Sequence, residues 1–234
     1  KKRKPEAKTQ VYTEAEEFFL MRLAWEEWKE DNSLGACLAL ILLFYTGLRI
    51  GEVVALKRSD IDGLVAHICR SEVEVSVQID ETTFKQIGHM VIDHPKTSAG
   101  FRDVYLTHGG REVVDAALSG VAARGADDSY LFTNGITRVN VDMVTYRLKK
   151  YCNILGIPFR SAHKIRKTYV SHLIDGGVNI DAARIQVGHE DERTTLRCYT
   201  FNTKTQDETN EQFERALSTL APNPGILVTA NGYR

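Results

Sequence analysis

One short stretch of this chain is apolar on every side, and it restricts the folds that the chain can adopt. Residues 34–44 read L-G-A-C-L-A-L-I-L-L-F and carry no charge. A helix that is apolar all round belongs in the interior of a protein. No apolar run in the chain approaches the length of a membrane span. We therefore expect this segment to form a buried helix.

Other helices are predicted on both sides of this segment. Thr13-x-x-Glu16 is a capping box, which predicts the start of a helix. One of the polar residues 31–33 is expected to cap the buried helix. Apolar side chains recur at helical spacing over about residues 109–124 and 140–154, which predicts two more helices.

Between these helices the chain changes period. Residues 64–69 are mostly apolar, apolar residues alternate with polar ones over residues 73–79, and shorter runs follow at 90–92 and 104–106. This period is typical of strands. Residues 94–102 contain Pro and Gly, and they predict a hairpin turn between the last two strands. The predicted fold class is therefore α+β, mostly helical with a small antiparallel β-sheet.

The stretch from His163 to Tyr199 gathers polar side chains that suit chemistry. His163 and Arg166 stand three residues apart, so on a helix they project from one face. A second short helix is expected to end at Gly188, with His189 just beyond it and Tyr199 ten residues later. Two imidazoles, a guanidinium and a phenol thus lie on short elements joined by tight turns.

These groups suit the attack on a phosphodiester. Negative charge gathers on the phosphate oxygens during the attack, and Arg neutralises it with paired N–H donors. His moves a proton or donates a hydrogen bond, and Tyr can form a covalent intermediate. The stretch has no Asp/Glu cluster for a catalytic metal, and the four cysteines of the chain lack C-x-x-C spacing. We expect reduced thiols, no metal site and no disulfide framework.

Arg49 is a further candidate because it directly follows the buried helix. The turn at Gly47 places its guanidinium next to the core, where an unpaired charge would be costly. It needs an anion, which is either Glu52 three residues on or a ligand. The ordinary alternative is an exposed arginine at a helix start. Lys96 lies in the predicted hairpin, where a lone Lys usually serves only solubility.

The net charge of −1 does not indicate nucleic-acid binding, but the charges are unevenly distributed. Basic residues gather in residues 1–8 and 160–167, and acidic residues gather in 14–31 and 207–214. Such separation can give a nearly neutral protein one basic face. For any one cluster alone, a solvated surface is the simpler interpretation.

At this point the motifs resemble those of a known family, the tyrosine recombinases or phage integrases. Thr46–Glu52 (T-G-L-R-I-G-E) resembles the family's first-arginine motif, and His163–Arg166 resembles its H-x-x-R box. Gly188–Tyr199 contains G-H, T-T and Y in the order of the final box. Pro95–Asp103 resembles the hairpin that carries the catalytic lysine. The resemblance covers about residues 13–217 and is closest to conjugative-transposon and phage integrases.

The resemblance implies a site-specific recombinase that cuts and rejoins DNA to integrate or excise a mobile element. Tyr199 would attack a DNA phosphate, form a 3′-phosphotyrosine bond and free a 5′-hydroxyl. The bond energy stays in the protein–DNA link, so no metal, ATP or other cofactor is required. Arg49 and Arg166 would stabilise the charge that develops at phosphorus.

The other candidates receive supporting roles from the same resemblance. His163 is the proton acceptor for the nucleophile, and Lys96 is the acid for the leaving 5′-oxygen. His189 would donate a hydrogen bond to the scissile phosphate. Glu52 is expected to support Arg49 or His163 without taking part in the chemistry.

The resemblance also suggests how the chain is divided and what it binds. Residues 1–10 are predicted to be a basic linker from an N-terminal core-binding domain outside this sequence, 11–220 the catalytic domain, and 221–234 a tail that docks on a neighbouring subunit. The expected partners are double-stranded DNA, at the element ends and the target site, and further copies of the chain, as a dimer to tetramer. The expected place of action is the nucleoid in the bacterial cytoplasm, away from any membrane. The candidate DNA contacts are Lys4, Arg147, Arg160, Lys164 and Lys167.

Residues 71–88 depart from the family's minimal three-stranded sheet. We expect an additional β element there, which shapes or holds DNA. Two other functions share parts of the pattern. A non-catalytic DNA-binding protein on the same scaffold should have lost members of the constellation, which are all present here. A type IB topoisomerase would use similar chemistry but would relax plasmid DNA as a monomer, without exchange of partner strands.

Overall fold

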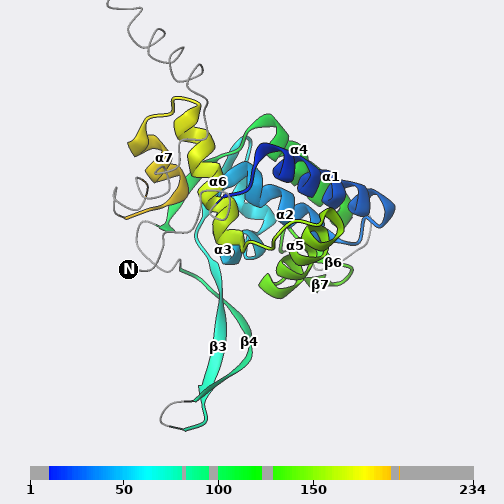
Figure 1. Ribbon diagram of the computed structural model, residues 1–234. Helices are drawn as coiled ribbons and strands as arrows, with labels where there is room; N and C mark the ends of the chain where they lie inside the picture. The colour runs from blue at the N-terminus through cyan, green and yellow to red at the C-terminus, as the bar shows by residue number, and fades with distance from the viewer. Residues whose placement is uncertain (1–10, 81–82, 95–99, 123–128, 191–194, 196–234) are drawn as a thin grey trace, which may run out of the picture. The chain divides into compact units, whose positions relative to one another are not determined.

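Helix α2 (Gly35–Thr46) is the buried centre of the fold, as its all-round apolar sequence predicts (Figure 1). The computed structural model describes residues 11–80, 83–94, 100–122, 129–190 and 195, all within one unit of residues 1–201. Every residue of α2 except Tyr45 is buried. Around it pack α1 (Glu14–Glu30), α4 (His108–Ala122), α5 (Val141–Leu155) and α6 (Ala162–Asp175). No helix in these ranges is both long and apolar enough to cross a bilayer.

Local and distant side chains cap the first two helices. Thr13 and Glu16 form the predicted capping box of α1, with reciprocal hydrogen bonds of 2.8 and 3.2 Å. At the start of α2 the Ala36 N–H donates instead to Asn134 Oδ1, 98 residues along the chain, at 3.0 Å. The predicted cap from residues 31–33 is therefore wrong. The N-cap residue is Leu34, whose side chain cannot accept a hydrogen bond, and a distant amide supplies the oxygen.

The strands of the described residues form three separate antiparallel sheets. They are β1 (Ile61–Asp62), β2 (Val65–Ile68) and β5 (Arg102–Tyr105), then β3 (Ser71–Gln78) and β4 (Phe84–Ile92), then β6 (Thr133–Asn134) and β7 (Thr137–Arg138). Strand β2 is central in its sheet and sets Ile68 opposite Arg102 of β5. Strands β4 and β5 belong to different sheets, so the two strands on either side of the predicted turn do not pair with each other as the sequence suggested. The strand order depends on contacts between distant segments, which a local turn signal does not encode.

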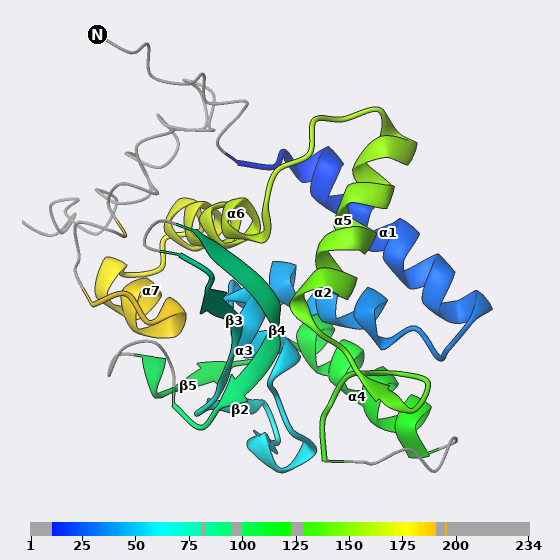
Figure 2. The same cartoon turned by 90° about the horizontal axis from the view of Figure 1, so that it is seen from below.

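Two short helices complete the part of the fold that positions the polar candidates. Helix α3 (Ile50–Val54) follows α2 after the turn at Gly47, and α7 (Ile180–Val187) follows α6. Helix α7 lies beside α6 and β5 (Figure 2). A 3-10 turn at Arg58–Asp60 leads from α3 into β1.

Strands β3 and β4 form the additional β element that was predicted for residues 71–88. This ribbon extends away from the helices in Figure 1, and several of its large apolar side chains are exposed: Val77, Ile79, Phe84, Ile87 and Met90. Residues 71–88 include four acidic residues and one Lys. Such charges oppose a direct contact with DNA phosphates. A role of the ribbon in shaping DNA would therefore depend on its apolar side chains.

The base of the ribbon is tied to the helices by Glu72. Its buried carboxylate lies 2.5 Å from Nη1 of Arg138 and accepts a 2.8 Å hydrogen bond from the N–H of Val141, at the start of α5. Helix α3 also packs closely here, because a Cβ added to Gly51 would lie 2.5 Å from the Glu72 carbonyl oxygen. The ribbon therefore starts directly against the helix that follows Arg49.

Gly47, the C-cap residue of α2, is expected to tolerate no side chain. Its φ of 60° is left-handed, and an added Cβ would lie 2.3 Å from Cδ1 of Tyr169. Gly63 has a similar φ of 55°, but nothing lies within 4 Å of an added Cβ. We expect Gly63→Ala to lower the free energy of unfolding by about 1–2 kcal/mol for backbone strain. We expect Gly47→Ala to lower it by a further ~1–3 kcal/mol, because the ring must move. Urea denaturation measures both losses, and equal losses would contradict the packing of Tyr169 on this turn.

Candidate active site

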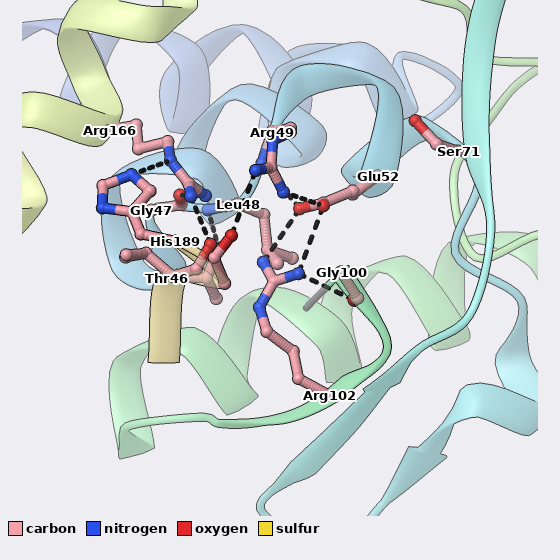
Figure 3. Close-up of polar contacts among 12 residues, drawn as sticks. Thr46, Gly47, Leu48, Arg49, Glu52, Ser71, Gly100, Arg102, Arg166 and His189 are labelled. Carbon is pink, nitrogen blue, oxygen red and sulfur yellow. Dashed lines mark hydrogen bonds and ion pairs between the residues drawn. The ribbon is translucent and has the colours of Figure 1, made fainter. Parts of the chain in front are cut away.

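The end of α2, the start of α3 and the end of α7 meet at the turn between α2 and α3, and α6 passes beside them. Arg49 is the N-cap residue of α3 and follows the left-handed turn at Gly47. Arg166 lies in α6 and is only 3% exposed. His189 comes directly after Gly188, the C-cap residue of α7. Figure 3 shows the side chains of Arg49, Arg166 and His189 around this turn. The structure thus brings together three candidates from distant motifs.

The C-terminal end of α7 is the common anchor of three arginine side chains. The last carbonyl groups of a helix lack partners within the helix and carry the negative end of its dipole. Here each of three consecutive carbonyls accepts a hydrogen bond from a different guanidinium. The pairs are Arg102 with Gln186 at 3.0 Å, Arg166 with Val187, and Arg49 with Gly188 at 3.1 Å. One helix end therefore fixes all three guanidiniums relative to one another.

The Glu52 carboxylate links two of these arginines. Its Oε1 accepts from Arg49 Nη1 at 2.8 Å and from Arg102 Nη1 at 3.2 Å. Its Oε2 accepts from the Arg49 backbone N–H and from Arg102 Nη2, both at 2.9 Å. Burial would raise the pKa of Glu52, but the hydrogen bonds and charges of Arg102 and Arg49 lower it below its usual range. Glu52 is thus ionised at neutral pH, and the predicted contact with Arg49 is present.

Arg102 is the residue that sequence reasoning missed at this site. In the sequence it stands only as part of the hairpin pattern around Lys96. Its side chain is 4% exposed and reaches from β5 to both α3 and α7. A single Arg at the start of a strand carries no local signal of such contacts. Only a pairing of its charge with Glu52, 50 residues earlier, could have pointed to it.

His189 holds Arg166 and is neutral. Arg166 donates from Nη1 to the Gly47 carbonyl at 2.9 Å and from Nε to His189 Nε2 at 3.3 Å. A guanidinium only donates, so Nε2 is the acceptor and the proton of the ring is on Nδ1, which lies 3.0 Å from Oγ1 of Thr195. Burial, followed by the charges of Arg166 and Arg49, lowers the pKa of His189 to about 3. Both ring nitrogens therefore have protein partners, and the predicted hydrogen bond to a phosphate would require one of them to be released.

His163 lies at the exposed edge of the same cluster. Partial burial lowers its pKa, and the positive charges of Lys167, Arg166, Lys164 and Arg49 lower it further. The ring is therefore neutral at neutral pH, the form that accepts a proton. Lys164 and Lys167, two of the predicted DNA contacts, lie beside it on α6.

Two other predicted DNA contacts are engaged with α1. Arg147 forms an ion pair with Glu27, and Arg160 binds Glu16 at 2.9 Å. The expected separation of acidic and basic surfaces is therefore wrong in this region. Acidic side chains of α1 lie against basic residues that come more than 100 positions later in the chain. The distribution of charges along the sequence does not show such contacts.

Several predicted residues lie outside the described residues. These are Lys4, Lys96 and Tyr199, together with the proposed linker 1–10 and tail 221–234. Within the described ranges no three His, Cys, Asp or Glu side chains gather as they would around a metal ion. The described cluster consists of arginines, histidines and one carboxylate, which can bind an anion and move a proton.

The low pKa of His189 gives a testable pH dependence of stability. The ordinary His value is 6.5 and the folded value is about 3, so the folded state binds fewer protons between them. The stability that His189 confers is therefore present above about pH 6.5 and is lost as the pH falls towards 3. We expect His189→Gln to flatten the fall in the free energy of unfolding as the pH is lowered from about 6.5 to 4. Urea denaturation across this range measures the slope.

His67 provides a control of opposite sign. Its hydrogen bond to Asp103 raises its pKa, so its contribution is present below the ordinary His value and is lost as the pH rises through the folded value. His67→Gln is therefore not expected to flatten the acid limb. An unchanged acid slope in His189→Gln would show that the ring is not held neutral by its surroundings.

A family pattern matches this sequence, and two bacterial proteins are among its relatives. The pattern of the phage integrase family matches residues 20–206. The XerC-like tyrosine recombinase of Caldanaerobacter subterraneus subsp. tengcongensis is 28% identical over 180 residues, covering 68% of this chain and 44% of that protein. The ICEBs1 integrase of Bacillus subtilis is 26% identical over 163 residues, covering 67% of this chain and 42% of that protein. The chain thus spans less than half the length of these relatives.

Solved structures share the fold. The Tn1549 transposon integrase, solved in complex with transposon right end DNA, superposes with a TM-score of 0.64 at 22% identity, covering 92% of this chain and 67% of that one. The XerA recombinase superposes with a TM-score of 0.63 at 18% identity, covering 95% of this chain and 67% of that one. The match over residues 20–206 identifies the family. The chain belongs to the phage integrase family, and its fold is that of a tyrosine recombinase catalytic domain.

Proposed function

We propose that this chain is the catalytic domain of a site-specific DNA recombinase, the integrase of a mobile element. The observation that carries the proposal is the meeting of Arg49, Arg166 and the neutral His189 at one helix end, with the neutral His163 at the exposed edge of the same cluster. Arg49 and the Gly188 carbonyl that it binds are 139 residues apart in the chain. Guanidiniums that are fixed before a ligand arrives suit a phosphate that gains charge during attack, since no reorganisation is then needed.

Arg49 and Arg166 differ in how they could interact with a phosphate. The Arg49 side chain is 33% exposed, so a DNA phosphate can reach its guanidinium. Arg166 is almost fully buried, and backbone carbonyls and His189 set its position. We infer that Arg49 clamps the phosphate oxygens directly and that Arg166 supplies a fixed positive charge at close range.

The proposed reaction exchanges one phosphodiester for another. The Tyr199 oxygen attacks phosphorus, its proton passes to His163, and the bond from phosphorus to the 5′-oxygen breaks. Lys96 gives the leaving 5′-oxygen a proton. The products are a 3′-phosphotyrosine and a 5′-hydroxyl, so the number of phosphoester bonds is unchanged and no energy source is consumed. A 5′-hydroxyl from a partner strand reverses the steps and rejoins the DNA.

The partners follow from the same proposal. The Tn1549 integrase was solved with transposon DNA, and we propose that this chain likewise binds double-stranded DNA at element ends and target site. Lys164 and Lys167 lie near His163 on α6 and are proposed to contact the DNA backbone. Assembly on DNA as a dimer to tetramer, with residues 221–234 exchanged between subunits, remains a proposal. So does action on the nucleoid in the bacterial cytoplasm.

Covalent trapping tests this function. The full-length protein is incubated with nicked duplexes that tile the DNA on both sides of its own coding sequence. The nick lets the short cleaved strand diffuse away, so the adduct accumulates. We expect a DNA adduct that survives denaturing electrophoresis and maps to the peptide containing Tyr199. An adduct on another residue would contradict the mechanism. Adduct formation with plasmid relaxation but without strand exchange would indicate a topoisomerase instead.

A further inference from the structure

Arg102 takes part in a large set of hydrogen bonds at the site, although it belongs to none of the Arg or His motifs. It donates four hydrogen bonds, two to Glu52, one to the Gly100 carbonyl and one to the Gln186 carbonyl. Its guanidinium therefore joins β5 to α3 and to the end of α7. Figure 3 shows it approaching Glu52 from the side opposite Arg49.

Arg102 is not placed to bind the phosphate itself. Its side chain is 4% exposed, against 33% for Arg49. Four of the five N–H donors of a guanidinium are already used by protein acceptors. Besides the long-range effect of its charge, Arg102 can act on a reaction at this site through the groups that it holds.

The first of those groups is the Glu52 carboxylate. A carboxylate offers about four lone-pair directions, and here two are taken by Arg49 and two by Arg102. With all four directions used, the carboxylate has one orientation, and that orientation fixes both the backbone and the guanidinium of Arg49. Without Arg102, half of these bonds are lost and a buried carboxylate is left partly unsatisfied.

The second group is the last turn of α7. The carbonyl that Arg102 binds, that of Gln186, immediately precedes the carbonyls that bind Arg166 and Arg49. His189 follows in the next position. A guanidinium at Gln186 therefore sets where the other two acceptors lie.

We propose that Arg102 is a positioning residue of the recombinase reaction, which holds Glu52 and the end of α7 so that Arg49 meets the scissile phosphate in a reactive geometry. This inference rests on the function proposed above. A misplacement of about 1 Å in a catalytic group can cost about 10²-fold in rate. Binding of DNA depends on many phosphate contacts and should change little.

The test separates the rate of the covalent step from DNA binding. Adduct formation is followed in single turnover at saturating nicked DNA, using the duplexes that trap the wild-type protein. For Arg102→Gln we expect a rate about 10²-fold lower with a nearly unchanged dissociation constant for the same DNA. Arg22→Gln, which removes an exposed arginine paired with Glu26 on α1, is the matched control and should react at the wild-type rate.

A second variant keeps the test informative if Arg102→Gln does not fold. Arg102→Lys retains the charge and can reach one acceptor, but an ammonium cannot span Glu52, Gly100 and Gln186 together. We expect it to fold, as judged by urea denaturation, and still to lose at least about tenfold in rate.

Coupling to Glu52 distinguishes positioning from general damage to the fold. If Arg102 acts largely through Glu52, the double variant Arg102→Gln/Glu52→Gln should lose much less than the product of the two single losses. Wild-type rates in both Arg102 variants, or losses that simply multiply, would overturn the inference while leaving the recombinase function intact. Absence of any adduct with the wild-type protein would remove the proposed function and this inference together.

Discussion

Replacing Tyr199 by Phe is expected to abolish the covalent protein–DNA adduct while leaving DNA binding intact. Phe keeps the aromatic ring but lacks the oxygen that would attack phosphorus. A free phenol titrates near about 10, so its ionisation at pH 7 costs roughly 4 kcal/mol. The positive charges of Arg49, Lys164 and Lys167 near His163 are of the sign that lowers this cost.

The measurement compares adduct yield on denaturing gels with DNA affinity from mobility shifts. Tyr146→Phe is the matched control, because Tyr146 is exposed on α5 and has no proposed role. Its adduct yield should equal that of the wild-type protein. An adduct that persists in Tyr199→Phe would show that another residue is the nucleophile, and the proposed mechanism would have to be abandoned.

Replacing Arg166 by Gln is expected to slow adduct formation by about 10²–10³-fold at saturating DNA. The variant loses a buried positive charge beside the proposed phosphate site, together with the hydrogen bonds to the Gly47 and Val187 carbonyls and to His189. Arg166→Lys restores the charge without the planar fork, so it should recover only part of the rate. Single-turnover kinetics with an excess of nicked DNA measure the covalent step alone.

Arg111→Gln serves as the control for loss of an arginine outside the site. Arg111 pairs with Asp115 on α4 and donates to the Gly63 carbonyl. Its loss should leave the rate unchanged. Loss of stability in Arg166→Gln is checked by urea denaturation, and only molecules that remain folded are compared. A folded Arg166→Gln protein with a wild-type rate would contradict a role of this charge in the reaction.

The fold was predictable where it depends on neighbouring residues. The capping box at Thr13, the buried helix from Gly35 and the extra β element at 71–88 each have a signal within a few residues. The cap of α2 had no such local signal, because the oxygen that accepts its hydrogen bond belongs to Asn134 in a separate hairpin. The pairing of β5 with β2 likewise depends on segments more than 30 residues apart.

The residues of the candidate site also differ in whether a local sequence signal marks them. Arg49, His163, Arg166 and His189 were found because each belongs to a short motif with a recognisable spacing. Arg102 was missed as a partner of Glu52, since its importance arises only when β5 meets α3.

The electrostatics of the site were not visible in the sequence. The neutral state of His189 follows from burial against guanidiniums that approach from other segments. The sequence also did not show that Arg147 and Arg160 are paired with α1.

The acceptors at the end of α7 belong to the backbone, and this affects which changes the protein can survive. Every residue type presents the same carbonyl oxygen, so a substitution at position 186 or 187 does not by itself remove the acceptor of an arginine. The helix ends there because Gly188 adopts a left-handed φ of 66°. Inserting or deleting one residue before it would rotate the three oxygens by about 100° around the helix axis. The arginine anchors should therefore tolerate amino-acid substitutions in α7 far better than insertions or deletions.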